Sequence, residues 1–196
     1  MPEEISFAER YAQGKIPWDS GKPSEQLVRV LDAGTLTGTT VLEIGCGTGT
    51  NAIELARRGF EVTAADYVEQ AIQAARDKAH AAKVKVDFRV ADVLKNDLGG
   101  PYDILFDRGV YHHLRTVDLK GFQNFLKRVT HSGSWWLSLA GNAKEKREDG
   151  PPVVYEHEIR TEVGPLFDIV ELREFRFNTN QSDFRPLAWS ILMRRK

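Results

Sequence analysis

Apolar residues follow two different spacings along the chain, and the spacing changes at a glycine, a proline or an aspartate. Runs rich in β-branched and aromatic residues predict strands at 40–44, 60–65, 85–90, 102–106, 134–139, 167–177 and 187–194. Apolar positions three and four residues apart predict helices at 23–33, 48–58, 68–82 and 116–130, and the start of a short helix at 159–163. Strands that alternate with helices predict βαβ units and a mostly parallel sheet with helices on both faces.

The last third of the chain has a different pattern. Residues 142–152 are charged and contain Gly-Pro-Pro, so we expect a mobile loop there. The final two strands are joined by the polar run 178–186, and such a pair is naturally antiparallel. Trp135 and Trp136 are neighbours on a predicted strand, so we expect one to face the core and the other a covering helix. Residues 1–196 contain no repeat, and we expect a single domain.

Charge and cysteine content narrow the classes of partner. Lys and Arg number 27 against 28 Asp and Glu, which favours a small or neutral partner over nucleic acid or an anionic membrane. Cys46 is the only cysteine, which excludes an internal disulfide and a thiolate zinc cluster and suits a reducing compartment. The start of the chain lacks the blocks of a signal peptide, and no apolar run approaches the ~20 residues of a membrane span. We therefore expect a cytoplasmic protein; its oligomeric state is not predicted.

Three glycines follow the first predicted strand and precede a helix, at Gly45, Gly47 and Gly49. Glycine lets the backbone pass close to a ligand, and the helix start supplies free N–H donors. A dinucleotide fingerprint would place its third glycine at position 50, which is Thr50, and a phosphate-binding P-loop would need a lysine after the turn. A tight strand-to-helix connection with no ligand is the alternative interpretation.

An acidic residue lies near the end of each of the first three strands: Glu43, Asp66 and Asp92. Asp66 follows Gly45 at a distance suited to accepting hydrogen bonds from ribose hydroxyls. Taken singly, each acid fits an ordinary solvated loop. Together they favour a ligand that carries a ribose, an amine and a positive charge, rather than a pyrophosphate.

The pattern Glu43-x-Gly45-x-Gly47-x-Gly49 resembles the first motif of the class I S-adenosylmethionine-dependent methyltransferases, and the resemblance extends over nearly the whole chain. It implies a Rossmann-like, doubly wound α/β sheet of seven strands whose last strand is antiparallel. It also implies S-adenosyl-L-methionine as cofactor: Gly45 and Gly47 would pass under its methionine part, Glu43 would orient its amino group and Asp66 would bind the ribose. The predicted cofactor-binding residues are Glu43, Gly45, Cys46, Gly47, Gly49, Asp66, Tyr67 and Val93 near the adenine, Asp92, Asp107 and Trp18.

The substrate side is expected after the fourth strand, because ligands of open α/β sheets bind outside the carboxyl ends of the strands. The run Asp107-Arg108-Gly109, followed by an aromatic residue and a histidine, resembles small-molecule methyltransferases of the thiopurine, thiol and tellurite-resistance type. Either histidine of the pair could act as a base or be a capping or buried residue. The pair lacks metal-ligand spacing, so no metal is expected. The predicted catalytic residues are His112 and Arg108, and the predicted substrate-binding residues are Tyr11, Tyr111 and His113.

The stretch Ile16-Pro-Trp-Asp-Ser-Gly21 resembles the start of the cofactor-covering segment in the same enzymes, although Trp18 could instead anchor this arm to the core. These parallels divide the chain into a lid (1–22), a cofactor-binding core (23–140) and a substrate-side segment (141–196). The predicted function is methyl transfer to sulfur, oxygen or another nucleophilic atom of a small molecule. Methylation of a protein or RNA, and cofactor binding without catalysis, are the alternatives; the glycine spacing disfavours a dehydrogenase.

Overall fold

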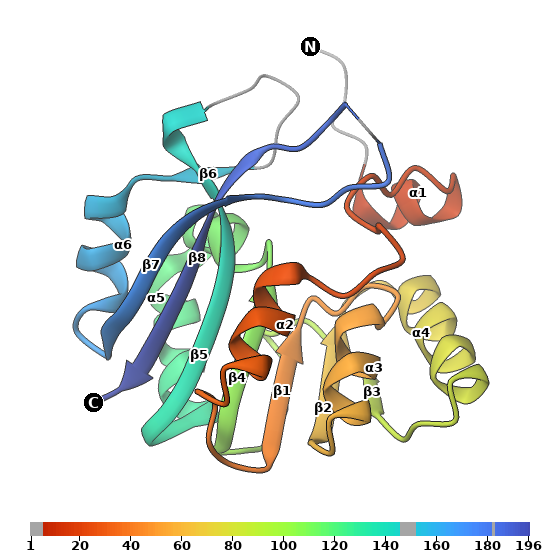
Figure 1. The fold of residues 1–196 in the computed structure, drawn as a ribbon, viewed down its shortest axis with the longest axis horizontal. Helices are drawn as coiled ribbons and strands as arrows, with labels where there is room; N and C mark the ends of the chain where they lie inside the picture. The colour runs from red at the N-terminus through yellow and green to blue at the C-terminus, as the bar shows by residue number, and fades with distance from the viewer. Residues whose placement is uncertain (1–5, 146–151, 182) are drawn as a thin grey trace.

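A computed structural model describes residues 6–145, 152–181 and 183–196. One mixed sheet, with strand order β3-β2-β1-β4-β5-β8-β7, forms the centre of the molecule (Figure 1). The strands are β1 (Thr40–Ile44), β2 (Glu61–Asp66), β3 (Asp87–Val90), β4 (Tyr102–Arg108), β5 (Thr130–Asn142), β6 (Val153–Val154), β7 (Phe167–Arg176) and β8 (Leu187–Arg195). β8 is antiparallel to β5 and to β7, and the short β6 pairs with β5 outside this order. The expected α/β fold and the antiparallel terminal pair are confirmed.

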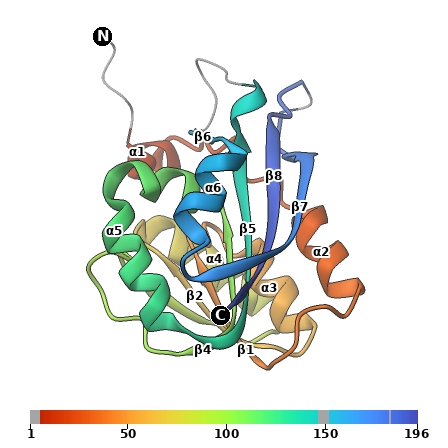
Figure 2. The ribbon, with the colours of Figure 1, turned by 90° about the vertical axis from the view of Figure 1, so that its left-hand side faces the viewer.

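Helices cover both faces of the sheet (Figure 2). They are α1 (Phe7–Ala12), α2 (Glu25–Asp32), α3 (Thr50–Arg57), α4 (Glu69–Ala81), α5 (Tyr111–Val129), α6 (Glu156–Val163) and the 3-10 turn η1 (Ala143–Glu145). Apolar residues of α2, α3 and α4 pack on one face, and those of α5 and α6 pack on the other. Among the described residues, no helix is both long and apolar enough to cross a membrane.

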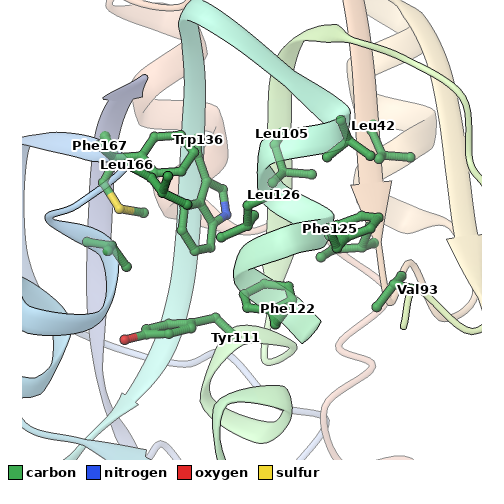
Figure 3. Packing of buried hydrophobic residues seen from close by; sticks show 14 of the residues in the cluster. Leu42, Val93, Leu105, Tyr111, Phe122, Phe125, Leu126, Trp136, Leu166 and Phe167 are labelled. Carbon is green, nitrogen blue, oxygen red and sulfur yellow. The ribbon is translucent and has the colours of Figure 1, made fainter. Parts of the chain in front are cut away.

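The two faces of β5 have separate hydrophobic cores. Trp136 is fully buried with the aromatic residues of α5 (Figure 3). Trp135 belongs to the cluster on the opposite face. Successive side chains of a strand point to opposite faces, so adjacent tryptophans must be separated in this way. Their expected packing role is confirmed.

The main departure from the predicted elements is the start of α5. The sequence places this start at residue 116, whereas the helix begins at Tyr111. Asp118 breaks it with φ −155° and ψ 84°, and its Oδ1 accepts a hydrogen bond from Gly121 N–H (2.8 Å), as a helix N-cap does. The apolar periodicity predicted only the part beyond this kink. As a consequence, Tyr111, His112 and His113, which were expected in a substrate loop, lie in the first turn of a helix, whereas Arg108 ends β4.

Three smaller elements were not predicted: α1, η1 and β6. α1 has no buried residue, so it carries no core-facing apolar stripe that a periodicity search detects. Its N-cap Ser6 and Glu9 instead form a reciprocal capping box. In the expected loop 142–152, Asn142 ends β5 and residues 143–145 form η1, while 146–151 lie outside the described residues.

Candidate active site

The glycine turn between β1 and α3 lies at the carboxyl ends of the parallel strands (Figure 1). Gly45 and Gly47 have φ values of 63° and 54°, a region that favours glycine. A side chain on Gly45 would overlap Val110, and a Cβ on Gly47 would lie 2.8 Å from the Tyr11 hydroxyl. Gly49, the residue before α3, also has a positive φ (78°), and Cys46 N–H donates to Ala65 O of β2 (3.0 Å). The turn is therefore a rigid backbone cradle, and the buried Cys46 serves it through its backbone.

Asp66, at the end of β2, holds this turn in place. Its Oδ2 accepts a hydrogen bond from Gly47 N–H (2.9 Å), and its Oδ1 accepts one from Val68 N–H (3.0 Å). Burial raises the pKa of its carboxyl despite these two donors. Each carboxylate oxygen has a second lone pair, so Asp66 retains the capacity to accept from ribose hydroxyls.

Glu43 presents an unsatisfied carboxyl oxygen beside the turn. It is 1% exposed, and its Oε1 accepts a long hydrogen bond from Asn51 Nδ2 (3.4 Å). Within the described part of the chain, its Oε2 has no hydrogen-bond partner. Burial, with a contribution from the charge of Asp66, raises its pKa to about 8. A buried oxygen without a donor is costly, and an ammonium group is the kind of donor that would satisfy it. The residues present therefore fit the amino group of S-adenosylmethionine.

The predicted adenine side lies at the end of β3 and is more exposed. Asp92 accepts a hydrogen bond from Leu94 N–H (2.9 Å) and pairs with Lys95 (2.8 Å), which lowers the pKa of the Asp92 carboxyl. Val93 is buried in the core, whereas Tyr67 is 56% exposed. Their contact with adenine stays a prediction.

The N-terminal segment lies across the glycine turn. Trp18 Nε1 donates to the Tyr11 hydroxyl (3.3 Å), and Phe7 of α1 packs edge-on against both Tyr67 (6.3 Å) and His113 (5.7 Å). Burial raises the pKa of Tyr11, with the charge of Asp66 adding to the effect. The predicted lid residues Tyr11 and Trp18 are thus brought to the predicted cofactor residues.

A polar cluster fastens this segment to the cofactor turn, and the sequence reasoning did not identify it. Thr48 Oγ1 donates to Asp19 Oδ2 (2.6 Å), and Lys78 Nζ of α4 donates to Thr48 Oγ1 (2.5 Å). Asp19 belongs to the Pro-Trp-Asp stretch, which was a usable signal. Lys78 is 59 residues further along the chain, and nothing in the local sequence links the two.

Arg108 contacts two other segments of the chain. Its Nη1 donates to Trp18 O (3.0 Å), its Nη2 donates to Asn178 O (2.6 Å), and its guanidinium lies 4.8 Å from the centre of the Phe177 ring. Burial lowers its pKa to about 10, so it remains charged at neutral pH. These contacts join the N-terminal segment to the turn before β8, and an action of Arg108 on the substrate stays a prediction.

His112 is not suited to be a base. Gly141 N–H of β5 donates to its Nδ1 (2.6 Å), so the neutral ring carries its proton on Nε2. Burial lowers the pKa of His112 to about 3, and the charge of neighbouring His113 acts in the same direction. Its one basic nitrogen is already occupied, which corrects the prediction of a catalytic His112.

The side chains of Asp107 and Tyr111 also form hydrogen bonds to other parts of the protein. Asp107 Oδ1 accepts from Val110 N–H (3.1 Å) and Tyr111 N–H (3.0 Å), and its Oδ2 accepts from Trp136 Nε1 (2.9 Å). Tyr111 is buried in the core, and its hydroxyl donates to Glu162 of α6 (2.7 Å) (Figure 3). Asp107 therefore caps α5 instead of contacting cofactor, and Tyr111 packs in the core instead of binding substrate. His113, half-buried beside Phe7, is the predicted substrate-side residue that faces the N-terminal segment.

Comparison with known sequences points to methyl transfer. A family described as a methyltransferase domain matches residues 41–133. The chain is 29% identical to a 2-heptyl-1-hydroxyquinolin-4(1H)-one methyltransferase from Mycobacteroides abscessus over 86% of this chain and 76% of that one. It is 38% identical to a magnesium-protoporphyrin O-methyltransferase from Rhodobacter capsulatus, over 50% of this chain and 43% of that one. The chain thus spans under half the length of the Rhodobacter relative.

Solved structures share the fold. One, solved in work on the conversion of a disulfide bond into a thioacetal group during echinomycin biosynthesis, is 27% identical with a TM-score of 0.79 and covers 92% of this chain and 85% of that one. A Synechocystis magnesium protoporphyrin IX methyltransferase with bound S-adenosylmethionine has a TM-score of 0.68 at 20% identity, and covers 100% of this chain and 87% of that one. At that identity the second likeness concerns the fold alone.

Proposed function

We propose that this chain, a member of the class I S-adenosylmethionine-dependent methyltransferases, transfers the methyl group to sulfur, oxygen or another nucleophilic atom of a small molecule. The observation that supports a small acceptor is the cover over the glycine turn. Trp18 is held over it by Arg108, and Asn180 binds the same segment through Pro17 O (2.9 Å) and Ile16 O (3.1 Å). A turn covered from both ends of the chain admits a small molecule more readily than a protein or an RNA.

When bound, S-adenosylmethionine supplies a methyl carbon that accepts the acceptor's lone pair, while the electron pair of the broken C–S bond returns to sulfur. The contribution of the chain is to bind, orient and exclude water. Glu43 Oε2 would hold the amino group, Asp66 the ribose, and the Gly45–Gly47 backbone the methionine part. Tyr11 and Trp18 cover the turn. With His112 held neutral, an acceptor hydroxyl or thiol would release its proton to solvent or to His113.

The proposal divides the domain into a lid (1–22), a cofactor-binding core (23–140) and a substrate-side segment (141–196). It also includes a cytoplasmic location, which the single buried cysteine supports and cell fractionation tests.

Titration calorimetry and a turnover screen test the proposal. Calorimetry should detect binding of S-adenosylmethionine and S-adenosylhomocysteine and none of nicotinamide dinucleotides. A screen of thiols, phenols, carboxylates and amines should then release S-adenosylhomocysteine with at least one acceptor. Binding of the cofactor without turnover on any acceptor would favour a cofactor-binding module, and turnover on proteins or RNA alone would overturn the small-molecule proposal.

A further inference from the structure

A cavity of about 350 Å³ lies beside the end of β5, next to the first turn of α6. Small-molecule sites have volumes of about 300–1,000 Å³, so the cavity is large enough to hold an organic molecule. It is lined by Asn142, Lys144, Tyr155, Glu156, His157, Arg160 and Trp189. Asn142 and Lys144 belong to the loop 142–152 that the sequence predicts after the fifth strand.

Flat aromatic surfaces form much of the cavity wall. The rings of Tyr155 and His157 are stacked, with centroids 5.5 Å apart and planes at 25°. Trp189 is 4% exposed, and its position is fixed because its Nε1 donates to Val154 O (3.0 Å). Tyr155 is 55% exposed. A fixed indole together with an accessible stacked pair favours a planar aromatic ligand, since aromatic rings attract each other in stacked and edge-on arrangements.

The charged side chains at the cavity form two ion pairs. Lys144 and Arg160 face a single lining carboxylate, Glu156, which pairs with Arg160 (2.7 Å). Lys144 Nζ lies 5.5 Å from the centre of the Trp189 ring and pairs with Glu174 (2.5 Å). Both members of that pair are substantially exposed, and exposed pairs contribute only about 0–1 kcal/mol. An acidic group on a ligand can therefore take the place of Glu174.

The cavity and the cofactor turn lie at the same edge of the sheet. β5 is separated from β1 by β4 alone. In the register of these strands Ile44 is level with Ser138, and Asn142 lies four residues further along β5, so the ends of β1 and β5 are about 16 Å apart at about 4.8 Å per strand and 3.3 Å per residue. The first turn of α5 lies between the two places: a Cβ on Gly45 would meet Val110, which precedes α5, and the buried His112 of α5 accepts from Gly141 at the end of β5. An aromatic acceptor in the cavity would therefore present one edge to the cofactor across the first turn of α5.

We propose that this cavity binds the methyl acceptor, and that the acceptor is a planar molecule of at least two fused aromatic rings with a carboxylate or another acidic group. The proposal rests on the proposed function. The outer face of the stacked Tyr155–His157 pair would stack on the rings, Trp189 would contact their edge, and Lys144 would bind the acidic group.

Three probes with one carbon skeleton test this assignment: 3-hydroxy-2-naphthoate, uncharged 2-naphthol and saturated decahydro-2-naphthol. Equilibrium binding is measured with and without saturating S-adenosylhomocysteine. We expect 3-hydroxy-2-naphthoate to bind most tightly and decahydro-2-naphthol least. The double variant Tyr155→Ala/His157→Ala should weaken binding of both aromatic probes about tenfold, because the stacked pair on which the ligand would rest is lost. Cofactor affinity should stay within about twofold.

Lys144→Gln separates charge from shape. It should weaken binding of 3-hydroxy-2-naphthoate up to about fivefold and leave 2-naphthol unchanged. Lys120→Gln, on the exposed side of α5, is the matched control and should change neither. Absence of binding to the parent protein, or equal binding to parent and variants, would overturn the cavity assignment. Turnover of other small acceptors would show in that case that the proposed function still stands, whereas a failure to bind S-adenosylhomocysteine would overturn the function itself.

Discussion

The ends of β1 and β2 and the end of β4 lie side by side in the sheet, yet their polar residues are used in opposite ways. At β1 and β2, Glu43 has a carboxyl oxygen without a hydrogen-bond partner among the described residues, and Asp66 has spare lone pairs beside the glycine turn. At β4, the side chains of Asp107, Arg108 and His112 all bind groups of the protein itself. We propose that the first region binds the ligand, whereas the contacts of the second region hold the fold and the cover together.

This difference shows which kinds of polar residue can be placed from the sequence. A glycine with a positive φ and an acid at the end of a strand have roles that the local backbone sets. A polar residue that follows a strand can bind a ligand or another part of the chain, and only the tertiary structure decides which. Function prediction is therefore more secure for the cofactor than for the acceptor.

The largest effect is expected for Asp66→Ala. Loss of two charge-assisted hydrogen bonds to ribose, at about 1.5–3 kcal/mol each, should weaken S-adenosylmethionine binding by a factor of about 100 or more. Because Asp66 also accepts from Gly47 and Val68, the melting temperature should fall as well. Calorimetry and thermal unfolding measure both, with the exposed Asp32→Ala as control. If Asp66→Ala binds S-adenosylmethionine as tightly as the parent, Asp66 does not bind the ribose and the two regions do not differ in this way.

Arg108→Ala should have the next largest effect and tests the other region. Two partly buried carbonyls lose their donor, so residues 6–19 should exchange amide hydrogen faster and cofactor affinity should fall about tenfold. Arg108→Lys should recover only part of this, because a lysine lacks the fork that binds two carbonyls. Arg128→Ala, on α5, is the control. If the turnover number falls while hydrogen exchange and cofactor affinity stay unchanged, Arg108 acts on the substrate.

A smaller, pH-dependent effect is expected for Glu43. Its pKa of about 8 means that the carboxyl is protonated in the ligand-free protein near neutral pH. A cationic amino group favours the ionised form, so S-adenosylmethionine affinity should rise several-fold as the pH approaches 8, with proton release on binding. In the ligand-free protein, the stabilisation from the protonated form is complete below 4.5 and is lost as the pH rises through about 8.

Glu43→Gln should remove both pH dependences. Calorimetry in buffers of different ionisation enthalpy measures the released proton, and unfolding at several pH values measures the stability. A parent protein with the same affinity from pH 6.5 to 9 would contradict a role for Glu43 at the amino group.

The smallest effect on chemistry is expected for His112. His112→Asn keeps an acceptor for Gly141 N–H, so the turnover number should stay within about twofold, or ~0.4 kcal/mol, with the same pH profile. His112→Ala should destabilise the fold by about 1–3 kcal/mol, because a buried N–H loses its partner. With its pKa lowered to about 3, the parent histidine costs stability as the pH falls below 6.5, and His112→Asn should reduce that loss. If His112→Asn alters the pH profile of the turnover number, His112 acts as a base after all.

Most of the sheet was predictable because strands carry their own signal. β1 was predicted with its observed bounds, and the antiparallel β7 and β8 followed from a polar run between two apolar ones. The start of α5 was not, because the kink at Asp118 divides its periodicity. The contacts of Arg108 were not predictable either, because its two carbonyl partners are 90 and 70 residues away in the sequence. Such contacts leave no local pattern.

The bond from Arg108 to Asn178 also sets an order of events during synthesis. Chains emerge from the ribosome with the N-terminal end first, so the cover and the glycine turn are made early. The groups that fasten the cover, Asn178 and Asn180, follow β7 and are translated after β1 to β5. A nascent chain can therefore form β1 to β5 while its cover is still unfastened, and the cover is fastened only after the segment between β7 and β8 has left the exit tunnel.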